Sequence, residues 1–312
     1  MDVAGAHEGG ARRWLQELHG YAQRHPDALQ VVGLGQSLSP RWMLRRELQL
    51  RAETGRVVAA NNVSFLAAGA ERVVLLRNAL HFPHPREERK LSPAGLAEVT
   101  AQACVVRFAV RRADLVVVPS SSMLDRVCAH LPRLSSEMRV RPHPVTPRPW
   151  TPRVPGRIVC PVIPNPYKQL HLLLKDLVSA ADLVRSPACP VEILATLTEQ
   201  EVRAAGLTGS VVPLGRLAPD SLDATLGSAT AIYYPTALES FGYPLAEARV
   251  NGQPVLGLDT PHNREVAGSA LVPYGPSLRS MADALVQALT AEPAPDVGIT
   301  PDRYFSELLK VA

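Results

Sequence analysis

The sequence lacks any apolar run close to the roughly 20 residues that a helix needs to cross a bilayer. The N-terminal residues also lack the apolar core of a secretory signal peptide, and we therefore expect a cytoplasmic protein. Cysteine is scarce: Cys104, Cys128, Cys160 and Cys189 are far apart and have the spacing of neither a metal site nor a disulfide framework. We interpret all four as buried thiols and expect no structural zinc.

Excess charge of one sign is also absent. The formal net charge is only +4 for 312 residues, and the arginines are not gathered with aromatic residues, which argues against nucleic-acid binding. No acidic cluster suits a divalent ion, so we expect no metal. Residues 39–51 alone combine several arginines with Trp42, Met43, Leu44 and Leu48. This segment is either a basic amphipathic helix that contacts a membrane or an anionic acceptor, or a surface helix with its apolar side on the core, and we favour the second.

Short apolar runs rich in Val, Ile and Leu alternate with longer helical patterns along the whole chain. This alternation favours an α/β fold with parallel sheets. Strands are predicted in the first half at residues 29–34, 56–60, 72–76, 114–119 and 138–141. The second half repeats the layout, with strands at 157–163, 191–195, 211–214, 229–234, 254–258 and 270–272, and helices near 168–183, 221–227 and 280–289.

A proline-rich stretch separates the two halves. Residues 141–156 contain too many prolines for a helix or a central strand, so we interpret them as a linker between a domain at 1–148 and a domain at 149–312. Two open sheets joined in this way are expected to form a cleft, and ligands of such sheets bind outside the carboxyl ends of strands. A final helix at 302–311 is expected to pack back on the N-terminal domain.

The most informative segment is Glu239-Ser-Phe-Gly-Tyr-Pro-Leu-Ala-Glu247, which follows the apolar run at 229–234. It predicts a strand, a glycine turn and a helix start, with Pro244 at the first helical position and Glu247 in the first turn. The amides at such a helix end bind anions, and Gly242 lets the backbone approach a phosphate closely. The two flanking carboxylates accept hydrogen bonds from hydroxyls, which indicates a nucleotide sugar. The alternative is that Glu247 is only a favourable helix-start charge and Glu239 a solvated loop residue.

Other segments extend this pattern along the chain. Asn251-Gly-Gln-Pro-Val and Arg264-Glu-Val-Ala-Gly follow the nine residues, and Val212-Pro-Leu-Gly-Arg precedes them. The N-terminal half contains Ala113-Asp-Leu-Val-Val-Val-Pro-Ser120 and Glu8-Gly-Gly-Ala-Arg-Arg-Trp. Together these segments resemble the GT-B glycosyltransferases, most closely the retaining enzymes of glycosyltransferase family 4. The resemblance covers almost all of the C-terminal half and the N-terminal half in patches. It implies a GT-B fold, in which two Rossmann-like domains with parallel sheets face a cleft.

The resemblance implies roles for residues of the C-terminal, donor-binding half. It puts Glu239 on the hydroxyls of the transferred sugar, Glu247 on the ribose and Lys168 on the leaving diphosphate. The same resemblance puts the backbone amides of Phe241, Gly242 and Tyr243 near the diphosphate, and Gly215 in the loop near the nucleobase.

The N-terminal, acceptor-binding half contributes fewer candidates. The resemblance implies that Gly9 and Gly10 line the cleft from the opposite side. It also suggests a histidine that touches the donor sugar at about the place of Asn78 or His81. Either residue fits that role, with the alternative that both only pack the loop after the strand at 72–76.

Three positions depart from the family pattern. The arginine that commonly precedes the lysine is replaced at 162–163, so a cation is missing, and Asn165 as a neutral donor or Arg216 as a cation could take its place. His143 stands where the family has asparagine at the hinge, and is either a simple substitution or a cleft residue. Only residues 1–4 stand where the family has a full first strand.

The predicted activity is the transfer of a sugar from a nucleotide-diphosphate sugar to a hydroxyl of a small-molecule, glycan or lipid-linked acceptor, with retention of configuration. No cofactor is expected besides the donor substrate. No nucleophile with an adjacent base is evident, which suits a retaining transfer in which the leaving diphosphate accepts the acceptor proton on the same face. The missing arginine suggests one alternative, a non-catalytic nucleotide-sugar-binding partner protein. A sugar-nucleotide epimerase is a second, but the sequence offers no clear base for it. Any membrane association is expected to be peripheral.

Overall fold

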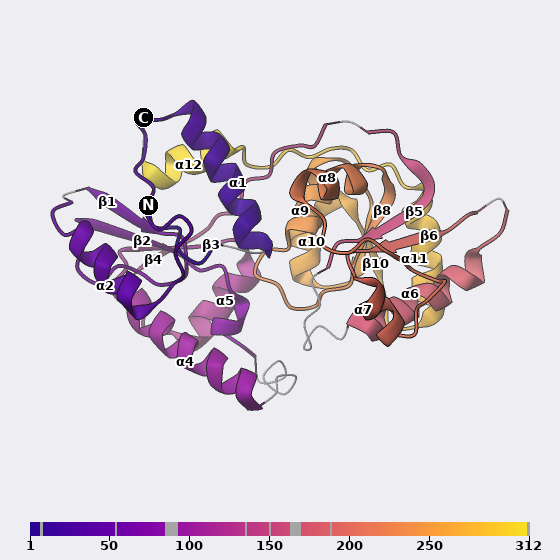
Figure 1. Ribbon diagram of the computed structural model, residues 1–312, viewed down its shortest axis with the longest axis horizontal. Helices are drawn as coiled ribbons and strands as arrows, with labels where there is room; N and C mark the ends of the chain where they lie inside the picture. The colour runs from indigo at the N-terminus through magenta and orange to yellow at the C-terminus, as the bar shows by residue number, and fades with distance from the viewer. Residues whose placement is uncertain are drawn as a thin grey trace. The chain divides into compact units, whose positions relative to one another are not determined.

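The computed structural model describes residues 1–6, 9–53, 55–84, 93–134, 136–149, 151–162, 170–187 and 189–310. The chain divides into two compact units. Unit 1 comprises Met1–Val145, Glu239–Phe241 and Ile299–Ala312, and unit 2 comprises Thr146–Leu238 and Gly242–Gly298. Each unit contains one parallel sheet with its helices (Figure 1).

Unit 1 is built on a four-stranded parallel sheet in the order β1-β2-β3-β4. Its strands are β1 (Arg56–Ala59), β2 (Glu71–Leu75), β3 (Leu115–Val118) and β4 (Glu137–Val140). Asp2 lies beside the end of β1 and forms isolated parallel bridges with Ala59 and with Val32. The prediction of a strand at 29–34 is wrong, because the segment forms only the single bridge at Val32. Gly33 and Gly35 have φ values of 78° and 72°, which are incompatible with an extended strand. The other four predicted strands of this half are confirmed, each within one residue at either end.

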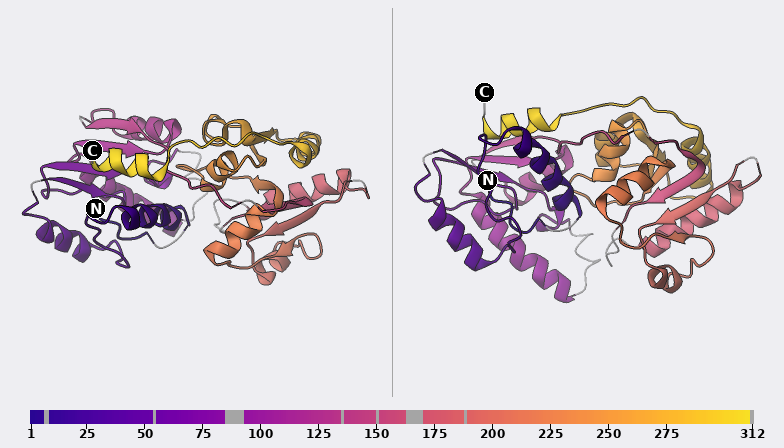
Figure 2. Two further views of the ribbon diagram at one scale, coloured as in Figure 1. Left: turned by 90° about the horizontal axis from the view of Figure 1, so that it is seen from above. Right: turned by 45° about the horizontal axis from the view of Figure 1, so that its top comes forward.

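The helices of unit 1 come from both ends of the chain. They are α1 (Gly9–Arg24), α2 (Pro40–Gln49), the 3-10 helix η1 (Ala79–His81), α4 (Pro93–Val110), α5 (Ser121–His130) and α12 (Pro301–Leu309). The last helix, α12, lies beside α1 (Figure 1, Figure 2). Trp14 of α1 packs edge-on against Phe305 of α12 with ring centroids 5.3 Å apart, and its Nε1 lies 3.4 Å from the hydroxyl of Tyr304. The C-terminal helix therefore completes the core around the first one.

The inner face of α2 differs from the prediction. Trp42 and Arg46 are buried, while Leu44 and Leu48 are 64% and 62% exposed. Arg46 turns inward because its Nη1 forms an ion pair with the buried carboxylate of Asp2, at 2.5 Å. The expectation of an apolar inner side is therefore wrong for the two leucines, and an ion pair occupies part of the core instead.

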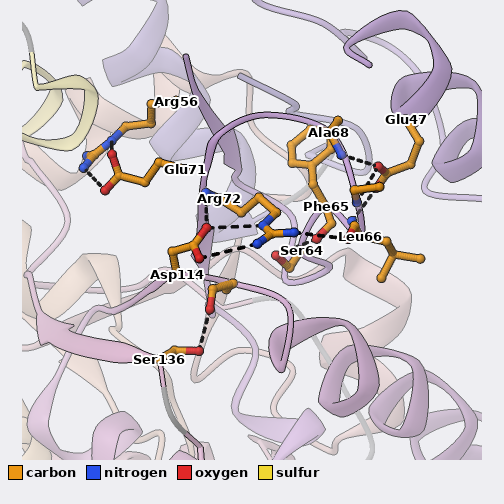
Figure 3. A network of polar contacts seen from close by, with 12 residues as sticks. Glu47, Arg56, Ser64, Phe65, Leu66, Ala68, Glu71, Arg72, Asp114 and Ser136 are labelled. Atoms are coloured by element: carbon orange, nitrogen blue, oxygen red, sulfur yellow. Dashed lines mark hydrogen bonds and ion pairs between the residues drawn. The ribbon is translucent and has the colours of Figure 1, made fainter. Parts of the chain in front are cut away.

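Ion pairs fix the amino-terminal edge of the same sheet (Figure 3). Arg56 and Glu71, the first residues of β1 and β2, pair with Nη2 and Oε1 2.5 Å apart. Arg72 pairs with Asp114, just before β3, with Nε and Oδ2 3.2 Å apart. These side chains connect neighbouring strands at this edge. Ligands of open α/β sheets bind at the opposite, carboxyl-terminal edge.

Unit 2 contains a six-stranded parallel sheet in the order β10-β9-β8-β5-β6-β7. Its strands are β5 (Val154–Cys160), β6 (Glu192–Ala195), β7 (Val212–Pro213), β8 (Ala229–Tyr234), β9 (Val255–Leu258) and β10 (Leu271–Tyr274). Counted from β5 as the first strand, this is the doubly wound order found in Rossmann-type sheets. All six predicted strands of this half are present, and the prediction of 229–234 agrees with β8 at both ends.

The strand β5 begins three residues earlier than predicted, at Val154 instead of residue 157. Its pairing with β8 shifts register between Val154 and Ile158. Gly156 lies in this shift with a φ of 76°, a conformation that glycine tolerates and that is typical of a bulge. Bulges also accept proline, so Pro155 does not interrupt the strand. The proline-rich segment is therefore part of the sheet from Val154 onward.

Several helices of unit 2 begin at or next to a proline. They are α6 (Leu170–Val184), α7 (Glu199–Ala204), α8 (Pro219–Gly227), α9 (Tyr243–Val250), α10 (Pro261–Ala267), the 3-10 helix η3 (Gly268–Ala270) and α11 (Leu278–Thr290). Proline occupies the first or second position of α8, α9 and α10, where its missing amide hydrogen would have no acceptor within the helix. Helices predicted near 168–183, 221–227 and 280–289 correspond to α6, α8 and α11.

The four cysteines differ in burial. Cys160 is buried at the end of β5, and burial raises the pKa of its thiol. Cys128 and Cys189 are partly buried, and Cys104 is exposed. The prediction of four buried thiols is therefore wrong for Cys104, which lies on the solvent side of α4 next to the buried Ala103.

Candidate functional site

The strand order of unit 2 creates a switch point between β5 and β8. From β5 the chain continues to β6 on one side, and from β8 it continues to β9 on the other. Ligands of doubly wound sheets bind outside the carboxyl ends of the strands at such a point. The chain after β8 carries the nine-residue segment 239–247, here called the signature. The chain after β5 carries Asn165 and Lys168, two predicted site residues that lie outside the described residues.

The connection from β8 to α9 ends in a left-handed glycine. Gly242 has φ 81° and ψ 73° and is the N-cap of α9. Tyr243 is the first helical residue, Pro244 the second and Glu247 the fifth. The prediction of Pro244 at the first position and Glu247 in the first turn is therefore wrong by one residue, because the helix begins at Tyr243. The first amides of such a helix have no acceptor within it, so the start of α9 has the chemistry of an anion site.

Glu247 is a buried carboxylate in unit 2, with 7% of its side chain exposed. Its Oε2 forms an ion pair with Nη2 of Arg148, which also pairs through Nε with Oδ1 of Asp223 at 3.1 Å. The backbone amide of Arg148 donates to Oδ1 of Asn251, whose Nδ2 donates to the carbonyl of Glu247 at 2.6 Å. The interpretation of Glu247 as only a favourable helix-start charge does not fit, because the residue is enclosed and ion-paired.

The first part of the signature, Glu239–Phe241, belongs to unit 1. Ser240 makes two hydrogen bonds there. Its hydroxyl donates to the carbonyl of Arg77 at 2.7 Å, and its carbonyl accepts from the hydroxyl of Ser120 at 2.9 Å. The signature therefore divides between the units at the bond before Gly242. Ser240, the neighbour of Glu239 in the chain, is thus bonded to Arg77 after β2 and to Ser120 after β3.

His143 supports the same part of the signature. Its ring packs edge-on against Phe241, with centroids 4.9 Å apart, and its Nδ1 lies 3.5 Å from the hydroxyl of Tyr304. Burial, together with the nearby Arg77, lowers the pKa of His143 well below 6.5. The side chain is therefore a neutral, enclosed ring at neutral pH.

Asn78 and His81 lie together after β2. The side chain of Asn78 caps η1 by accepting from the amide of Leu80 at 3.0 Å, and its Nδ2 lies 3.2 Å from Nε2 of His81. His81 is 6% exposed, and burial, with a smaller contribution from Arg107, lowers its pKa to about 4. The imidazole is neutral at pH 7, so this pair offers hydrogen bonds and no charge.

The predicted glycines lie in different places. Gly9 and Gly10 are the first two residues of α1 and are exposed. Gly215 follows β7 with a φ of 65°, and its amide donates to the carbonyl of Leu197 at 2.8 Å. The described residues therefore connect Gly215 to the turn after β6.

Arg216, the cation considered as a substitute for the missing arginine, already has bonding partners within unit 2. Arg216 donates to the carbonyl of Thr196 at 2.5 Å and pairs with Glu201 at 2.6 Å. Val162, one of the two residues considered at this position, is 4% exposed, and its amide donates to Oγ1 of Thr196 at 2.8 Å; the other, Ile163, lies outside the described residues. An apolar side chain is thus buried directly after β5.

The sequence interpretation missed Arg148, which it treated as part of a linker. Its only sequence signal is a cation between Pro147 and Pro149, two residues that hold the backbone extended. The partner Glu247 is 99 residues away, so no local pattern connects them. Ser120, by contrast, lies directly after the β3 sequence, where a functional hydroxyl can be anticipated.

The described part of the chain contains no group of three or more His, Cys, Asp or Glu side chains that could hold a metal ion. Within the same residues, none of the helices combines the length and apolar character needed to cross a membrane.

No protein-family model and no curated protein sequence matches the chain. Solved structures do match. TarM shares 12% identity with a TM-score of 0.57 over 86% of this chain and 53% of TarM. A mutant of TarM from S. aureus, in complex with fondaparinux, alpha-GlcNAc-glycerol and UDP, shares 13% identity with a TM-score of 0.51 over 78% of this chain and 47% of that one. The chain therefore spans about half the length of these neighbours.

At such low identity the similarity concerns the fold. The two parallel-strand sheets of this chain match those of GT-B glycosyltransferases, which confirms the α/β fold class predicted from the sequence.

Proposed function

We propose that the protein transfers a sugar from a nucleotide-diphosphate sugar to a hydroxyl acceptor and retains the anomeric configuration. The observation that carries this proposal is the doubly wound sheet of unit 2, with the left-handed Gly242 and the start of α9 following the switch-point strand β8. An anion-binding helix start beside a buried carboxylate, Glu247, suits a ligand that combines a diphosphate with hydroxyls.

The proposed reaction needs no nucleophile on the protein. The bond between the anomeric carbon and the diphosphate oxygen breaks, and the acceptor oxygen bonds to the same face of that carbon. The acceptor proton passes to the departing diphosphate oxygen. Lys168 and the amides at the start of α9 would stabilise the negative charge that develops on the diphosphate, which is usually the dominant form of catalysis in such sites. Glu239 would hold the hydroxyls of the transferred sugar, and no metal ion is invoked.

The proposal is tested by incubating the protein with a panel of nucleotide-diphosphate sugars and measuring nucleotide release, with and without candidate hydroxyl acceptors. Acceptor-dependent release, with an α-linked product from an α-linked donor, supports it. Inversion at the anomeric carbon contradicts retention. The absence of nucleotide binding across the panel contradicts the whole proposal.

Two substitutions separate the proposed roles of the carboxylates. Glu239→Ala should abolish transfer and leave nucleotide affinity nearly unchanged, because it removes a contact to the sugar only. Glu247→Ala should mainly weaken nucleotide affinity. Glu199→Ala is the matched control, since Glu199 is exposed at the start of α7. Equal and mild effects of the two site substitutions would argue against the assignment.

A non-catalytic nucleotide-sugar-binding partner is the second candidate. The buried Val162 favours it, because a cation at this position would help the diphosphate to leave. Binding of a nucleotide sugar without turnover, in the presence of acceptors and a cell extract that supplies a partner, is the result expected from this alternative. A Val162→Arg variant that gains turnover would support it further.

A further inference from the structure

Helix α2 exposes two leucines to solvent and buries an arginine. Leu44 and Leu48 lie one turn apart on the same side of the helix, and they are 64% and 62% exposed. Arg46 lies on the opposite side and is 1% exposed, because it pairs with the buried Asp2. The ion pair with Asp2 therefore fixes the rotation of α2 about its axis, and this rotation directs both leucines outward.

Positive charge surrounds the two leucines. Arg41, Arg45 and Arg51 are exposed, and none of them forms an ion pair within the part of the chain that the structure describes. The one acidic residue within α2, Glu47, is already bonded to the backbone amides of residues 66–68 (Figure 3). The solvent side of α2 therefore combines exposed leucines with cations that have no carboxylate partner.

Helix α4 has a similar combination at its end. Val105 and Phe108 are 45% and 57% exposed, and Arg111 and Arg112 directly after the helix are exposed and form no ion pair with other described residues. The connections through α2, from Val32 to β1, and through α4, from β2 to β3, cross the parallel sheet in the same direction. Such crossovers are right-handed, so both helices cover one side of the sheet, opposite to α1 and α12 (Figure 1, Figure 2).

The two helices thus present one surface of unit 1. We call it the α2–α4 face and define it as the exposed side chains of α2, of the end of α4 and of the arginines that follow them. Apolar side chains that are exposed on neighbouring elements, and not singly, mark a surface that another molecule covers.

An anionic lipid surface fits this combination of side chains. Helices that carry leucine or phenylalanine beside arginine lie in the interface of a bilayer, with the apolar side chains at the acyl chains and the cations at the headgroups. Anionic lipids attract each basic side chain that comes near the surface. A second copy of this chain fits less well, because a two-fold axis across the face would bring the same unpaired arginines opposite one another.

We propose that the α2–α4 face docks on a membrane surface that contains anionic lipids. In this arrangement α2 lies parallel to the bilayer, Leu44 and Leu48 reach below the headgroups, and the exposed arginines contact the lipid phosphates. The face contains none of the residues to which the transfer reaction is assigned, so the docking surface is independent of the proposed function.

The test measures the binding of the full chain to lipid vesicles by co-sedimentation. Wild-type protein should bind vesicles of an equal mixture of phosphatidylcholine and phosphatidylglycerol at least about tenfold more tightly than vesicles of phosphatidylcholine alone. Added sodium chloride should weaken the binding, because salt screens the attraction. The double variant Arg41→Gln/Arg45→Gln should bind the mixed vesicles about tenfold to thirtyfold more weakly, since each basic side chain near such a surface contributes about fivefold.

The double variant Leu44→Ser/Leu48→Ser tests the insertion of the apolar side chains. It keeps every charge of the face, so attraction by charge alone predicts no change. Docking with the leucines below the headgroups predicts binding to the mixed vesicles that is weaker by at least about tenfold. Leu172→Ser/Leu183→Ser is the matched control, because both of these leucines are exposed on α6 in unit 2. It should bind like the wild type.

Arg12→Gln/Arg203→Gln is the control for net charge. Both arginines are exposed, lie on α1 and α7 and form no ion pair in the described ranges, so the control removes the same charge outside the face. It should bind within about twofold of the wild type, because the charges that it removes lie away from the docked surface. Thermal unfolding checks that each variant is folded, and the exposed substitutions should leave Tm nearly unchanged.

Three results would overturn the proposed docking. Wild-type protein that binds neither kind of vesicle excludes a lipid surface and leaves an acidic protein as the occupant of the face. Equal weakening by the two arginine variants would show that only the net charge of the chain matters. Binding that depends on Arg41 and Arg45 but is unchanged in Leu44→Ser/Leu48→Ser would show a loose attraction without insertion.

Discussion

Replacing Asp2 by alanine should destabilise unit 1 severely, although the residue is the second in the chain. Its side chain is fully buried and accepts four hydrogen bonds. Oδ1 accepts from Nε1 of Trp42 and from the amide of Ala4, both at 3.1 Å. Oδ2 accepts from Nη1 of Arg46 at 2.5 Å and from Nδ2 of Asn61 at 2.7 Å. The carboxylate is therefore the centre of a polar cluster inside the core.

The expected loss in unfolding free energy follows from the unpaired Arg46 that Asp2→Ala leaves in the core. Arg46 is 1% exposed and would keep its hydrogen bonds to the carbonyls of Val63 and Ser64, but it would lose its only described counter-charge. Removing one partner of a buried ion pair costs about 3–5 kcal/mol. We expect Asp2→Ala to lower the free energy of unfolding of unit 1 by this amount. Arg46→Met should also destabilise, and the double variant should lose less than the sum of the two by about 0.5–3 kcal/mol.

Guanidinium chloride unfolding followed by tryptophan fluorescence is a suitable assay, because Trp14 and Trp42 are both buried in unit 1. Asp283→Ala is the control, since Asp283 and Arg279 form an exposed pair on α11, and its effect should be at most about 0.5 kcal/mol. A loss below about 1 kcal/mol for Asp2→Ala, or exact additivity in the double variant, would refute the reasoning.

Two further predictions concern a buried ring and a bulge. Burial lowers the pKa of His143 well below 6.5, so below pH 6.5 the unfolded chain binds a proton that the native chain does not. The stability that His143 contributes is therefore complete above pH 6.5 and is lost as the pH falls, by up to about 1.4 kcal/mol per pH unit, and His143→Asn should reduce this slope in unfolding experiments between pH 7 and 5. Gly156→Ala should cost roughly 1–3 kcal/mol more than Gly209→Ala, measured by thermal unfolding. Both glycines have positive φ values, but a Cβ at Gly156 would lie 1.9 Å from the carbonyl oxygen of Pro190 and one at Gly209 would meet nothing within 4 Å. Equal costs at the two positions would contradict the steric explanation.

The parallel strands were predictable because each is a short apolar run between turn residues. The prediction of 229–234 succeeds at both ends, since six apolar or β-forming residues are followed directly by Pro235. The failure at 29–34 and the late start of β5 have one physical cause. Glycines with positive φ, at Gly33, Gly35 and Gly156, end a strand in one case and bend it in the other. The sequence shows that glycine is present but not which of these conformations the tertiary structure selects.

Candidate site positions could be located from the sequence where they follow strands. Candidate positions after β2, β3 and β8 are found from local sequence, because parallel strands present their carboxyl ends to ligands. The pairing of Arg148 with Glu247 was not predictable, since it joins segments 99 residues apart and depends on how α8, α9 and the connecting segment pack. The buried position of Arg46 was missed for the same reason: a cation within an amphipathic pattern is normally assigned to the surface, and only the buried Asp2 reverses this.

The division of the signature leads to a prediction that the nine-residue sequence alone does not make. Ser240, next to Glu239, makes two hydrogen bonds in unit 1, whereas Glu247 is paired with Arg148 in unit 2. Ser240→Ala removes the hydrogen bond to the carbonyl of Arg77, which is worth about 0.5–1.5 kcal/mol. If that loss appears in the positioning of Glu239, kcat falls by about twofold to tenfold while the nucleotide Kd stays constant. The control is Ser277→Ala, which removes the N-cap of α11 instead. A change in nucleotide affinity with unchanged kcat would mean that the two carboxylates act as one rigid pair, and the separate dependence argued from their hydrogen bonds would be wrong.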